Sequence, residues 1–406
     1  MPAIMQPAGR QFTESRLTGL DRVTVVGSGG SAALRDVTVH AAHGELLAVL
    51  GPSGSGKTTL LRAIAGLARV RSGEVYIEGR RVTATSVPER NVAMVFESSA
   101  LMPFLDVEHN LSWGLTRRGS AHGRLPEPEV RRRVSEQARG LRLSRLLGRM
   151  PTTLSAGEQG LVGTGRALVR VPSVFLLDEP LAHLDAAQRW STCRRIVDVV
   201  KGLDVTTIYV SHDQTEALAI ADRVALLSEG SVVQSGVPEE FYRRPASVFV
   251  AGFVGTPPIG LLPARPVGSS DAAGYRVGAR TLPLWAPLPP EVAGHAGRPV
   301  VLGVRPEHVY DATEGCDPRL VTMPATVVRA TFVGPETVVV LEVAAPPVTV
   351  PGAERSDTVA DRARLRARFP RDTRLRVADT LPIAVDVAQA HVFDAVSGAA
   401  LYHPAD

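Results

Sequence analysis

The stretch "GPSGSGKTT" at residues 51–59 constrains the fold of this chain more than any other feature. It fits the pattern G-x-x-x-x-G-K-[ST], and it lies between a strand-like apolar run at 44–51 and a helical pattern at 58–67. Glycines let successive backbone N–H groups of such a loop face one anion, and the following helix adds the positive end of its dipole. A chance Gly/Ser-rich turn would explain the loop but not its context. We therefore expect a phosphate site formed by Gly51, Pro52, Ser53, Gly54, Ser55, Gly56, Lys57, Thr58 and Thr59.

Two residues of this loop and two acids further along the chain have expected chemical roles. Lys57 can reach the β- and γ-phosphates of a nucleoside triphosphate, and the Thr58 hydroxyl can ligate Mg²⁺. A second apolar run, "VFLLDEP" at 174–180, ends in Asp178 and Glu179. Asp178 would hold Mg²⁺ through water, and Glu179 would polarise a water for in-line attack on the γ-phosphate. Acids often end strands, so this pair is informative only together with the phosphate loop.

The order of elements indicates an α/β fold for the first part of the chain. Between residues 20 and 236, strand-like and helix-like stretches alternate, which is typical of a mostly parallel sheet covered by helices. Residues 98–170 are mainly helical in pattern and suggest an inserted helical subdomain. Over 237–406, proline and glycine become dense and short β-rich pieces follow, which predicts a small all-β barrel or sandwich. Residues 1–19 are expected to form a disordered extension.

Composition excludes several classes of protein. The 406 residues are 44% hydrophobic and 21% charged, as expected for two or three globular domains. No run of about 18 apolar residues occurs, and the start lacks a basic segment followed by an apolar one, so neither a transmembrane helix nor a secretory signal is expected. Cys193 and Cys316 lack metal-site spacing and fit a reducing compartment. The net charge of +4 predicts a solvated surface rather than a nucleic-acid patch.

Further stretches resemble the sequence motifs of ABC-transporter ATPases, in the order that this family has them. The matching stretches are "MVFESSALMPFLDVEHNL" (94–111) for the Q-loop and the coupling region behind it, "LSAGEQGLVGTGRAL" (154–168) for the signature, "LAHLDAA" (181–187) for the D-loop and "YVSHDQTEAL" (209–218) for the switch histidine. The stretches 236–265, 302–309 and 393–401 resemble the linker, β-barrel domain and C-terminus of carbohydrate-importer ATPases of the maltose/trehalose type.

The resemblance implies a RecA-like P-loop ATPase core with an inserted helical subdomain, followed by a C-terminal all-β OB-type (TOBE/MOP-like) regulatory domain. It implies that ATP and Mg²⁺ bind between two such subunits, in a homodimer or a heterodimer, and that closure of the dimer drives carbohydrate uptake. The implied partners are two transmembrane permease subunits and an extracytoplasmic substrate-binding protein. The implied location is the cytoplasmic face of the cell membrane, and no nucleic-acid partner is expected.

The resemblance also assigns roles to residues of the signature and the D-loop, each with a local alternative. The signature residues are Ser155, Ala156, Gly157 and Glu158. The start of their helix would face the γ-phosphate bound by the opposite subunit, whereas "SAGE" also fits a capping box in which Ser155 and Glu158 bond to each other's backbone. Asp185 would touch the opposite subunit, and it would also serve as an ordinary helix N-cap.

Two further sites follow from the resemblance. His212 would sense the γ-phosphate, although a strand-end histidine bonded locally is the simpler interpretation of its position. Leu101, Met102 and Phe104 would form a coupling patch, that is, an apolar surface for a helix of a membrane subunit. The alternative for these three side chains is that they belong to the core.

The chain departs from the family pattern at several positions. Glu97 stands where the family has Gln, and in the signature Ala156 and Glu158 replace Gly and Gln. No Phe, Trp or Tyr occurs between Phe12 and Tyr76, where the family stacks an aromatic ring on adenine; Val25 or Val26 lies nearest that position. Base stacking is worth roughly 1–3 kcal/mol, so we expect weaker nucleotide binding or compensation by partner contacts.

Two other functions compete with transport. A soluble ABC ATPase acting on nucleic acid would show a basic stripe with interleaved aromatics, whereas aromatics make up only 5% of this chain. A nucleotide-binding structural subunit with feeble turnover would lack catalytic groups, whereas Lys57, Asp178, Glu179 and His212 are all present.

Glu97 generates a first prediction. It is expected at a strand end that faces Mg²⁺ and the attacking water, near Asp178 and Glu179, where one more like charge at ~4 Å costs about 4 kcal/mol at an effective dielectric of 20. Ligation of Mg²⁺ by Glu97 or its protonation would offset that cost. We therefore expect ATP hydrolysis by the parent to depend more steeply on Mg²⁺ and pH than hydrolysis by Glu97→Gln. Superimposable Mg²⁺ and pH profiles of the two proteins would contradict this.

Overall fold

The computed structural model describes residues 16–27, 29–96, 101–116, 125–182, 184–268, 273–313, 315–350, 362–370, 373 and 375–404. The chain divides into two compact units, one of residues 4–238 and one that contains residues 239–406. This division lies close to the boundary expected from the sequence at 236/237. None of the described helices is long and apolar enough to cross a membrane.

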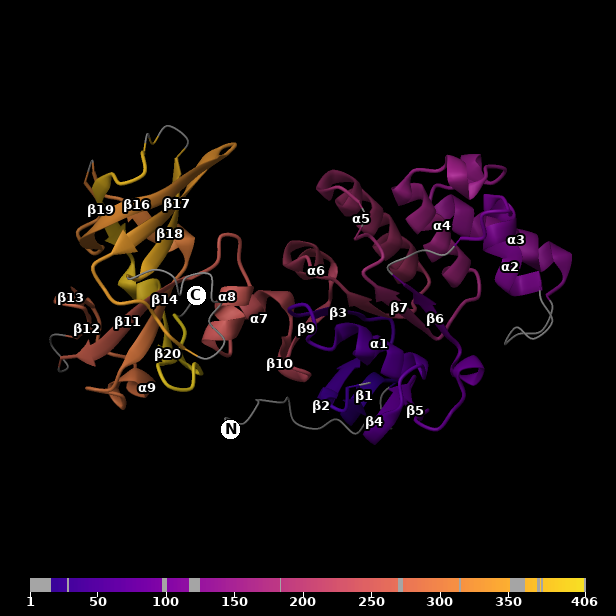
Figure 1. Ribbon diagram of the computed structural model, residues 1–406, viewed down its shortest axis with the longest axis horizontal. Coiled ribbons are helices and arrows are strands. Elements are labelled where there is room, and N and C mark those ends of the chain that lie inside the picture. The colour runs from indigo at the N-terminus through magenta and orange to yellow at the C-terminus, as the bar shows by residue number, and fades with distance from the viewer. Residues whose placement is uncertain are drawn as a thin grey trace. The chain divides into compact units, whose positions relative to one another are not determined.

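The first unit is built on two sheets (Figure 1). Its strands are β1 (Thr18–Val26), β2 (Ala32–Ala41), β3 (Leu46–Leu50), β4 (Val70–Ile77), β5 (Arg80–Arg81), β6 (Val92–Val95), β7 (Val174–Asp178), β8 (Thr206–Val210), β9 (Arg223–Ser228) and β10 (Ser231–Gly236). One sheet has the order β10-β9-β3-β8-β7-β6 and the other the order β2-β1-β4-β5. In the six-stranded sheet, β9, β3, β8, β7 and β6 run parallel, and β10 is antiparallel to β9.

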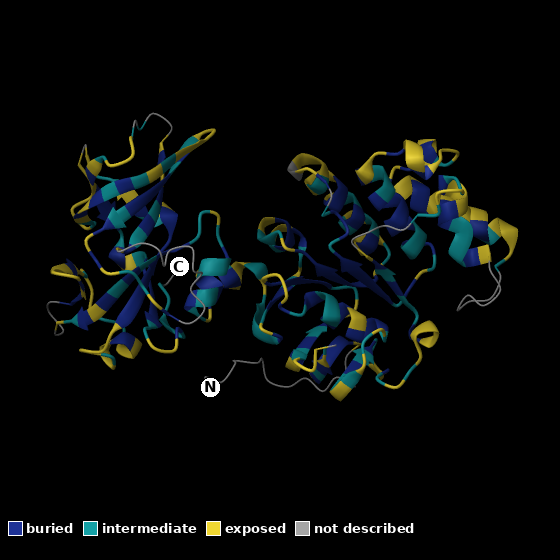
Figure 2. Ribbon diagram, viewed as in Figure 1, coloured by how far each residue is buried: buried dark blue, intermediate teal, exposed yellow. Residues whose placement is uncertain are grey.

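Side chains of the central strands alternate between two cores on opposite faces of the six-stranded sheet. In β7, Val174 and Leu176 join the core that also contains α1 (Lys57–Ala65) and the four-stranded sheet, whereas Phe175 and Leu177 join the core of the helical side. Every residue of β3, β7 and β8 is buried (Figure 2). A parallel sheet covered on both faces has no polar side, which explains why these strands form continuous runs of apolar and β-branched residues in the sequence.

The helical side of the first unit contains most of its helices. They are α2 (Val107–Thr116), α3 (Glu127–Gly140), α4 (Ala156–Leu168), α5 (Ala186–Gly202) and α6 (Gln214–Ile220). The first four of these helices share one core with β6, β7 and β8. The predicted helical stretch 98–170 thus contains α2, α3 and α4, and the α/β fold expected from the alternating pattern is confirmed.

The second unit is mainly β-structure. Its strands are β11 (Gly260–Val267), β12 (Gly274–Val277), β13 (Arg280–Pro283), β14 (Val300–Val304), β15 (Val309–Asp311), β16 (Val321–Val333), β17 (Glu336–Val343), β18 (Arg364–Pro370), β19 (Thr380–Val385), β20 (His391–Asp394) and β21 (Ala400–Tyr402). They form two sheets, β13-β12-β11-β14-β20-β21 and β15-β19-β16-β17-β18, in which all pairs are antiparallel and between which one core lies. This arrangement agrees with the expected all-β domain of OB type.

Three short helices accompany these sheets: α7 (Pro238–Arg243), α8 (Val248–Phe253) and α9 (Pro290–Ala293). Arg305, which is 2% exposed, ties the first two to the sheets. Its guanidinium donates to the carbonyl oxygens of Tyr242 at 2.8 Å, Ala251 at 3.1 Å and Val254 at 2.7 Å, and it lies 4.0 Å above the Tyr242 ring. A buried cation needs such partners, so this arginine fixes the start of the second unit.

The expected N-terminal extension needs correction. The disordered extension was expected to reach residue 19, but β1 begins at Thr18 and Leu17 is buried; residues 1–15 lie outside the described residues. The proline-dense stretch 255–266 lies in the region expected to be all-β, and β11 contains Pro263 and Pro266. Residues 260–264 pair only with β14 and residues 265–267 only with β12. Each residue of β11 is therefore paired on one side only. Proline, which has no backbone N–H, is tolerated where that N–H would face the unpaired side.

The pairing of His391 with His403 generates a prediction about pH. Their Nδ1 atoms are 3.0 Å apart, and burial lowers the pKa of His391 to about 3 and that of His403 to about 4. Both values lie below the ordinary value of about 6.5 in an unfolded chain. The neutral pair therefore contributes stability above pH ~6.5 that is lost as the pH falls toward the folded-state values.

We expect the thermal unfolding midpoint of the second unit to decrease when the pH is lowered from 7 to 5. His391→Gln should make this decrease smaller. The matched control is His295→Gln, which changes a half-buried histidine outside this pair and should leave the dependence of the midpoint on pH as in the parent. Calorimetric scans over this pH range measure both. Equal parent midpoints at pH 7 and pH 5 would overturn the prediction.

Candidate active site

The phosphate loop between β3 and α1 has the backbone that its glycines predict. Gly51, Gly54 and Gly56 have φ angles of 152°, 80° and 106°, which residues with a Cβ rarely adopt. A Cβ on Gly51 would lie 2.2 Å from the carbonyl oxygen of Leu227, and one on Gly56 would lie 2.6 Å from that of Ala33. Both conformation and space thus require glycine where the loop turns. The hydroxyl of Ser55 is buried and has no hydrogen-bond partner among the described residues, as suits a group that faces a ligand.

Lys57 is buried at the start of α1. Its Nζ donates to the carbonyl oxygens of Gly51 at 2.9 Å and Pro52 at 3.0 Å. Burial lowers the pKa of Lys57, and the negative charges of Glu179 and Asp178 oppose that shift. The ammonium therefore lies beside both the loop and the two acids, where it can neutralise phosphate charge.

Thr58 and Asp178 join the two halves of the predicted site. Thr58 Oγ1 donates to Asp178 Oδ1 at 3.0 Å, although the two residues are 120 positions apart in sequence. Asp178 is the last residue of β7 and is 7% exposed. Because β3, β8 and β7 are parallel neighbours, their carboxyl ends meet at the same edge of the sheet.

Glu179 and His212 meet at this edge as well. Glu179 follows β7, with a φ of 48° and its backbone N–H donating to the Val210 carbonyl at 3.1 Å. His212 follows β8, and its Nδ1 lies 2.9 Å from Glu179 Oε2. A non-glycine residue at positive φ stores strain of a kind often found at functional sites. The simpler interpretation of His212 was a histidine bonded to a nearby group. It does make such a contact, and its partner is Glu179, a predicted catalytic residue.

The signature stretch forms the N-terminus of α4. Ser155 is the N-cap, and it forms a capping box with Glu158, as the pattern "SAGE" predicts: the Glu158 N–H donates to Ser155 Oγ at 3.3 Å, and the Ser155 N–H donates to Glu158 Oε2 at 2.9 Å. The carboxylate that departs from the family pattern therefore has a local structural role. Ala156 is exposed and Gly157 is buried in the first turn.

Asp185 is the N-cap of α5, where its Oδ1 accepts a hydrogen bond from the Gln188 N–H at 2.9 Å. The simpler alternative for this residue is therefore confirmed. The residue is exposed, so a contact with another subunit is compatible with the cap. That contact stays a prediction.

Glu97, the residue expected at the end of β6, lies outside the described residues. The structure does place the strand before it at the edge of the six-stranded sheet. The residues of β6 alternate between partly buried and buried. Phe96, directly after the strand, is 43% exposed.

Val25 and Val26, the two residues nearest the predicted base position, differ in burial. Val25 is 3% exposed and belongs to the core, whereas Val26, at the end of β1, is 37% exposed. The start of β2, which follows Val26 in the same hairpin, packs against Gly56 of the phosphate loop, where Ala33 O leaves no room for a Cβ. Val26 is therefore the exposed apolar side chain at the end of the hairpin that borders the loop.

The three residues of the predicted coupling patch differ in exposure. Leu101 and Met102 are partly buried, and Leu101 packs against the core, whereas Phe104 is 69% exposed. The fully buried Asn110 of α2 holds this loop: its side chain accepts from the Met102 N–H at 2.9 Å and donates to the carbonyl oxygens of Met102 and Leu105 at 3.1 and 2.8 Å. Phe104 is thus presented by a fixed loop, and the alternative that it belongs to the core is wrong.

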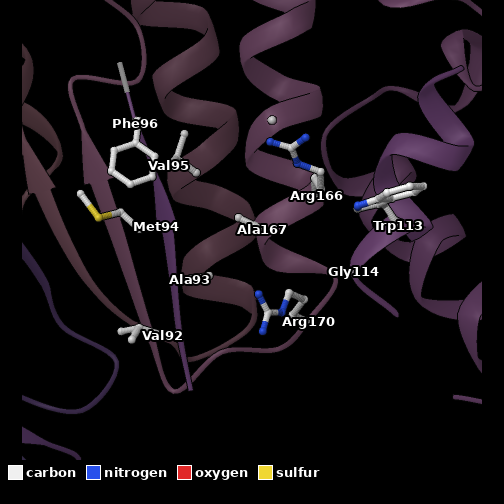
Figure 3. Close-up of a pocket in the computed structure, with 11 residues that line it drawn as sticks. Val92, Ala93, Met94, Val95, Phe96, Trp113, Gly114, Arg166, Ala167 and Arg170 are labelled. Atoms are coloured by element: carbon white, nitrogen blue, oxygen red, sulfur yellow. The ribbon is translucent and has the colours of Figure 1, made fainter. Parts of the chain in front are cut away.

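A pocket of about 240 Å³ lies between β6, α2 and the end of α4 (Figure 3). Five consecutive residues, 92–96, line it. Successive side chains of a strand point to opposite faces, so this pocket follows the free edge of β6. Its other walls carry Trp113, Arg166 and Arg170. Burial lowers the pKa of Arg166.

Sequence reasoning missed Asn110, the two arginines of the pocket and the buried acid Glu216. Each makes contacts with residues that are distant along the chain or in another element, so no short local pattern carries the signal. A buried Asn or Glu within an apolar helical face is the one sequence feature that could have drawn attention to Asn110 and Glu216.

Comparisons with known proteins find similar sequences and structures. The sequence model of the ABC transporter family matches residues 34–182. The trehalose import ATP-binding protein SugC of Mycobacterium tuberculosis is 38% identical over 400 residues, which cover 95% of this chain and 98% of SugC. The sn-glycerol-3-phosphate import ATP-binding protein UgpC of Salmonella typhimurium is 43% identical over 293 residues, which cover 71% of this chain and 79% of UgpC. Among solved structures, cbiO1 from Clostridium perfringens, part of the ABC transporter complex cbiONQ, has a TM-score of 0.51 at 26% identity and covers 56% of this chain and 90% of cbiO1.

The exposed Val26 generates a prediction about nucleotide affinity. A tyrosine at this position would offer a ring on which the base can stack, so Val26→Tyr should lower the Kd for ATP roughly ten-fold. Fluorescence titration of the full chain with ATP measures this. Val87→Tyr is the matched control, because Val87 is similarly exposed, at 41%, in the 3-10 helix Val87–Arg90, which is part neither of the β1–β2 hairpin nor of the phosphate loop. An unchanged Kd for Val26→Tyr, or a parent that already binds as tightly as this variant, would refute the prediction.

Proposed function

The chain belongs to the ATP-binding subunits of ABC transporters, and from this premise we propose that it couples hydrolysis of Mg-ATP to uptake of a carbohydrate through partner membrane subunits. The observation that carries the proposal is the meeting of the Thr58–Asp178 pair with the Glu179–His212 pair at one edge of a parallel sheet, beside Lys57. These five groups suit phosphoryl transfer to water.

The residues that would hold Mg²⁺ are Thr58 and Asp178. Their oxygens are 3.0 Å apart, which is about the separation of neighbouring ligands around an octahedral ion with bonds of roughly 2.1 Å. Within the described residues, no group of three or more His, Cys, Asp or Glu side chains could hold a metal ion. Such a pair suits Mg²⁺, which keeps waters and binds substrate phosphates. When bound, the ion neutralises charge on the phosphates. Glu97 stays a further candidate ligand.

The other residues act around the attacking water. Glu179 polarises this water as a general base. His212 holds the Glu179 carboxylate in place and senses whether the γ-phosphate is present. Lys57 neutralises charge on the β- and γ-phosphates, and the N–H groups of the phosphate loop bind their oxygens.

A second ATPase subunit would complete the site, in a homodimer or a heterodimer. The N-terminus of α4 is exposed at Ser155 and Ala156, and helix N-termini bind anions through free N–H groups and the helix dipole. Asp185 is exposed in the same unit. We assign both to the surface that faces the ATP of the partner subunit.

Two transmembrane permease subunits are the partners proposed for the apolar features around α2. The exposed ring of Phe104 provides an anchor of the kind that dominates interfaces. The pocket along β6 offers a free strand edge together with two arginines. A helix from a permease would bind here, and the proposed location of the chain is therefore the cytoplasmic face of the cell membrane.

The proposed cargo is a carbohydrate or a glycerol phosphate, because SugC is named for trehalose import and UgpC for sn-glycerol-3-phosphate import. An extracytoplasmic substrate-binding protein would deliver it. Neither alternative function has support: the relatives are import proteins rather than nucleic-acid enzymes, and the groups needed for turnover come together in the fold.

The role of Glu179 generates a prediction about turnover. Glu179→Gln keeps the shape of the side chain but removes the base, so kcat should fall about 100-fold or more, while the Kd for ATP stays within two- to three-fold. Phosphate release by the purified full chain with Mg-ATP, together with an ATP titration, measures both values.

Glu291→Gln is the matched control, because it removes an exposed carboxylate on α9 of the other unit and should leave kcat unchanged. Glu179→Gln turning over at half the parent rate would contradict the catalytic assignment. A parent as slow as Glu179→Gln would instead favour the structural, low-turnover subunit.

A further inference from the structure

The turn that carries His212 is closed by the hydroxyl of the residue before it. Ser211 Oγ accepts a hydrogen bond from the Asp213 backbone N–H at 3.0 Å. Ser211 is 4% exposed, whereas the side chain of His212 is 53% exposed. The turn therefore directs one side chain into the protein and the next one out, toward Glu179 at 2.9 Å.

Glu216, in the first turn of α6, forms hydrogen bonds with Ser211 and Asp213, the residues before and after His212. Its carboxylate Oε2 accepts a hydrogen bond from Ser211 Oγ at 3.2 Å, and its backbone N–H donates to Asp213 Oδ1 at 3.2 Å. The same Asp213 oxygen accepts from the Thr215 N–H at 2.9 Å, so it caps α6. Ser211, Asp213 and Glu216 thus form a closed ring of hydrogen bonds around the base of the histidine.

The Glu216 carboxylate is buried, at 5% exposure, and is itself held from the other side. Tyr209 Oη of β8 donates to its Oε1 at 2.6 Å. Cys193 of α5 lies beside it. Burial raises the pKa of the Cys193 thiol, and the negative charge of Glu216 raises it further. A buried carboxylate is costly unless its oxygens are satisfied, and here hydroxyls from a strand and from the turn satisfy them.

Arg189 of α5 also fixes the turn around His212. Arg189 Nη1 donates to Asp213 Oδ2 at 3.4 Å, and its Nη2 donates to the Leu184 carbonyl at 2.8 Å. Asp213 is therefore fixed on both carboxylate oxygens. The backbone before and after His212 is tied to α5, α6 and β8, so the direction of the imidazole is set by buried contacts rather than by the exposed ring itself.

We propose that Glu216 is a positioning residue for ATP hydrolysis, because its carboxylate fixes Ser211, directly before His212, and so aims the imidazole at Glu179. This inference rests on the proposed roles of His212 and Glu179. Glu216 acts through the Ser211 hydroxyl and makes no contact with the nucleotide. Loss of that single link should release the turn while leaving the fold and the phosphate loop in place.

Two substitutions separate this role from a purely structural one. Ser211→Ala removes the hydroxyl that links Glu216 to the turn, and Tyr209→Phe, the matched control, removes the hydroxyl on the other carboxylate oxygen and leaves the turn intact. A misplacement of about 1 Å can cost up to about 100-fold in rate, and we expect Ser211→Ala to lower kcat about ten-fold with the KM for ATP within two-fold. Tyr209→Phe should lower the melting temperature with kcat within two-fold.

Further variants test whether the effect passes through His212. Glu216→Met, which cannot accept either hydrogen bond, should lower kcat as Ser211→Ala does, and Glu216→Gln should recover part of the rate because its amide oxygen can still accept from Ser211. In a His212→Ala background, Ser211→Ala should cause no further loss of kcat. All rates are phosphate release by the full chain with Mg-ATP.

Each outcome has a distinct meaning. If His212→Ala lowers kcat but Ser211→Ala does not, the positioning role is overturned and the proposed function stands. If Ser211→Ala costs as much with His212 absent as with it present, its effect is structural and the inference fails. If His212→Ala leaves kcat unchanged, the role proposed for His212 fails and the inference fails with it.

Discussion

The parallel hydrogen-bonded ladder of β3, β8 and β7 is the constraint on which the rest of the ATP site depends. Pairing runs to the carboxyl end of each strand, where Val49 lies opposite Val210 and Asp178 opposite Val210 from the other side. Because the three strands end together, the phosphate loop, His212 and the acids meet without any local sequence relation. The Glu179 N–H extends the ladder by one more hydrogen bond, to Val210. The Glu179 backbone is therefore held in place by the sheet itself.

The sequence predicted those parts of the site that have a local signature, and it missed the parts that depend on packing. The phosphate loop, the capping box at Ser155 and the N-cap at Asp185 could be recognised because their chemistry lies within a few neighbouring residues. The apolar run of β6 could not reveal that the strand lies at a sheet edge, because strand order is a long-range property. Glu216 was missed for another reason: its hydroxyl donors, Tyr209 and Ser211, are only seven and five positions away, but their convergence on one carboxylate depends on how β8, the turn after it and α6 pack together.

The acid at position 158 illustrates how a departure from a family pattern can be absorbed locally. Its carboxylate accepts a hydrogen bond from the Ser155 N–H, and Ser155 Oγ accepts one from the Glu158 N–H. A negative charge in the first turn of a helix is favourable with respect to the helix dipole. The same box, however, takes up two of the N–H groups that an anion at this terminus would use. A phosphate of a partner subunit would therefore have to bind through the N–H groups of Ala156 and Gly157, and would do so beside a fixed negative charge.

The identity of residue 57 shows the strength of the constraint at the phosphate site. Only two of the 45 basic residues of the chain are lysines, Lys57 and Lys201, and all others are arginines. A composition so biased toward arginine would favour arginine at position 57 if the fold tolerated it. The ammonium is a compact charge held by two loop carbonyls at 2.9 and 3.0 Å, whereas a guanidinium is a planar fork with five donors. The tight curl of the loop leaves room for a point charge that can turn from these carbonyls to a phosphate oxygen, and this explains why lysine is retained here.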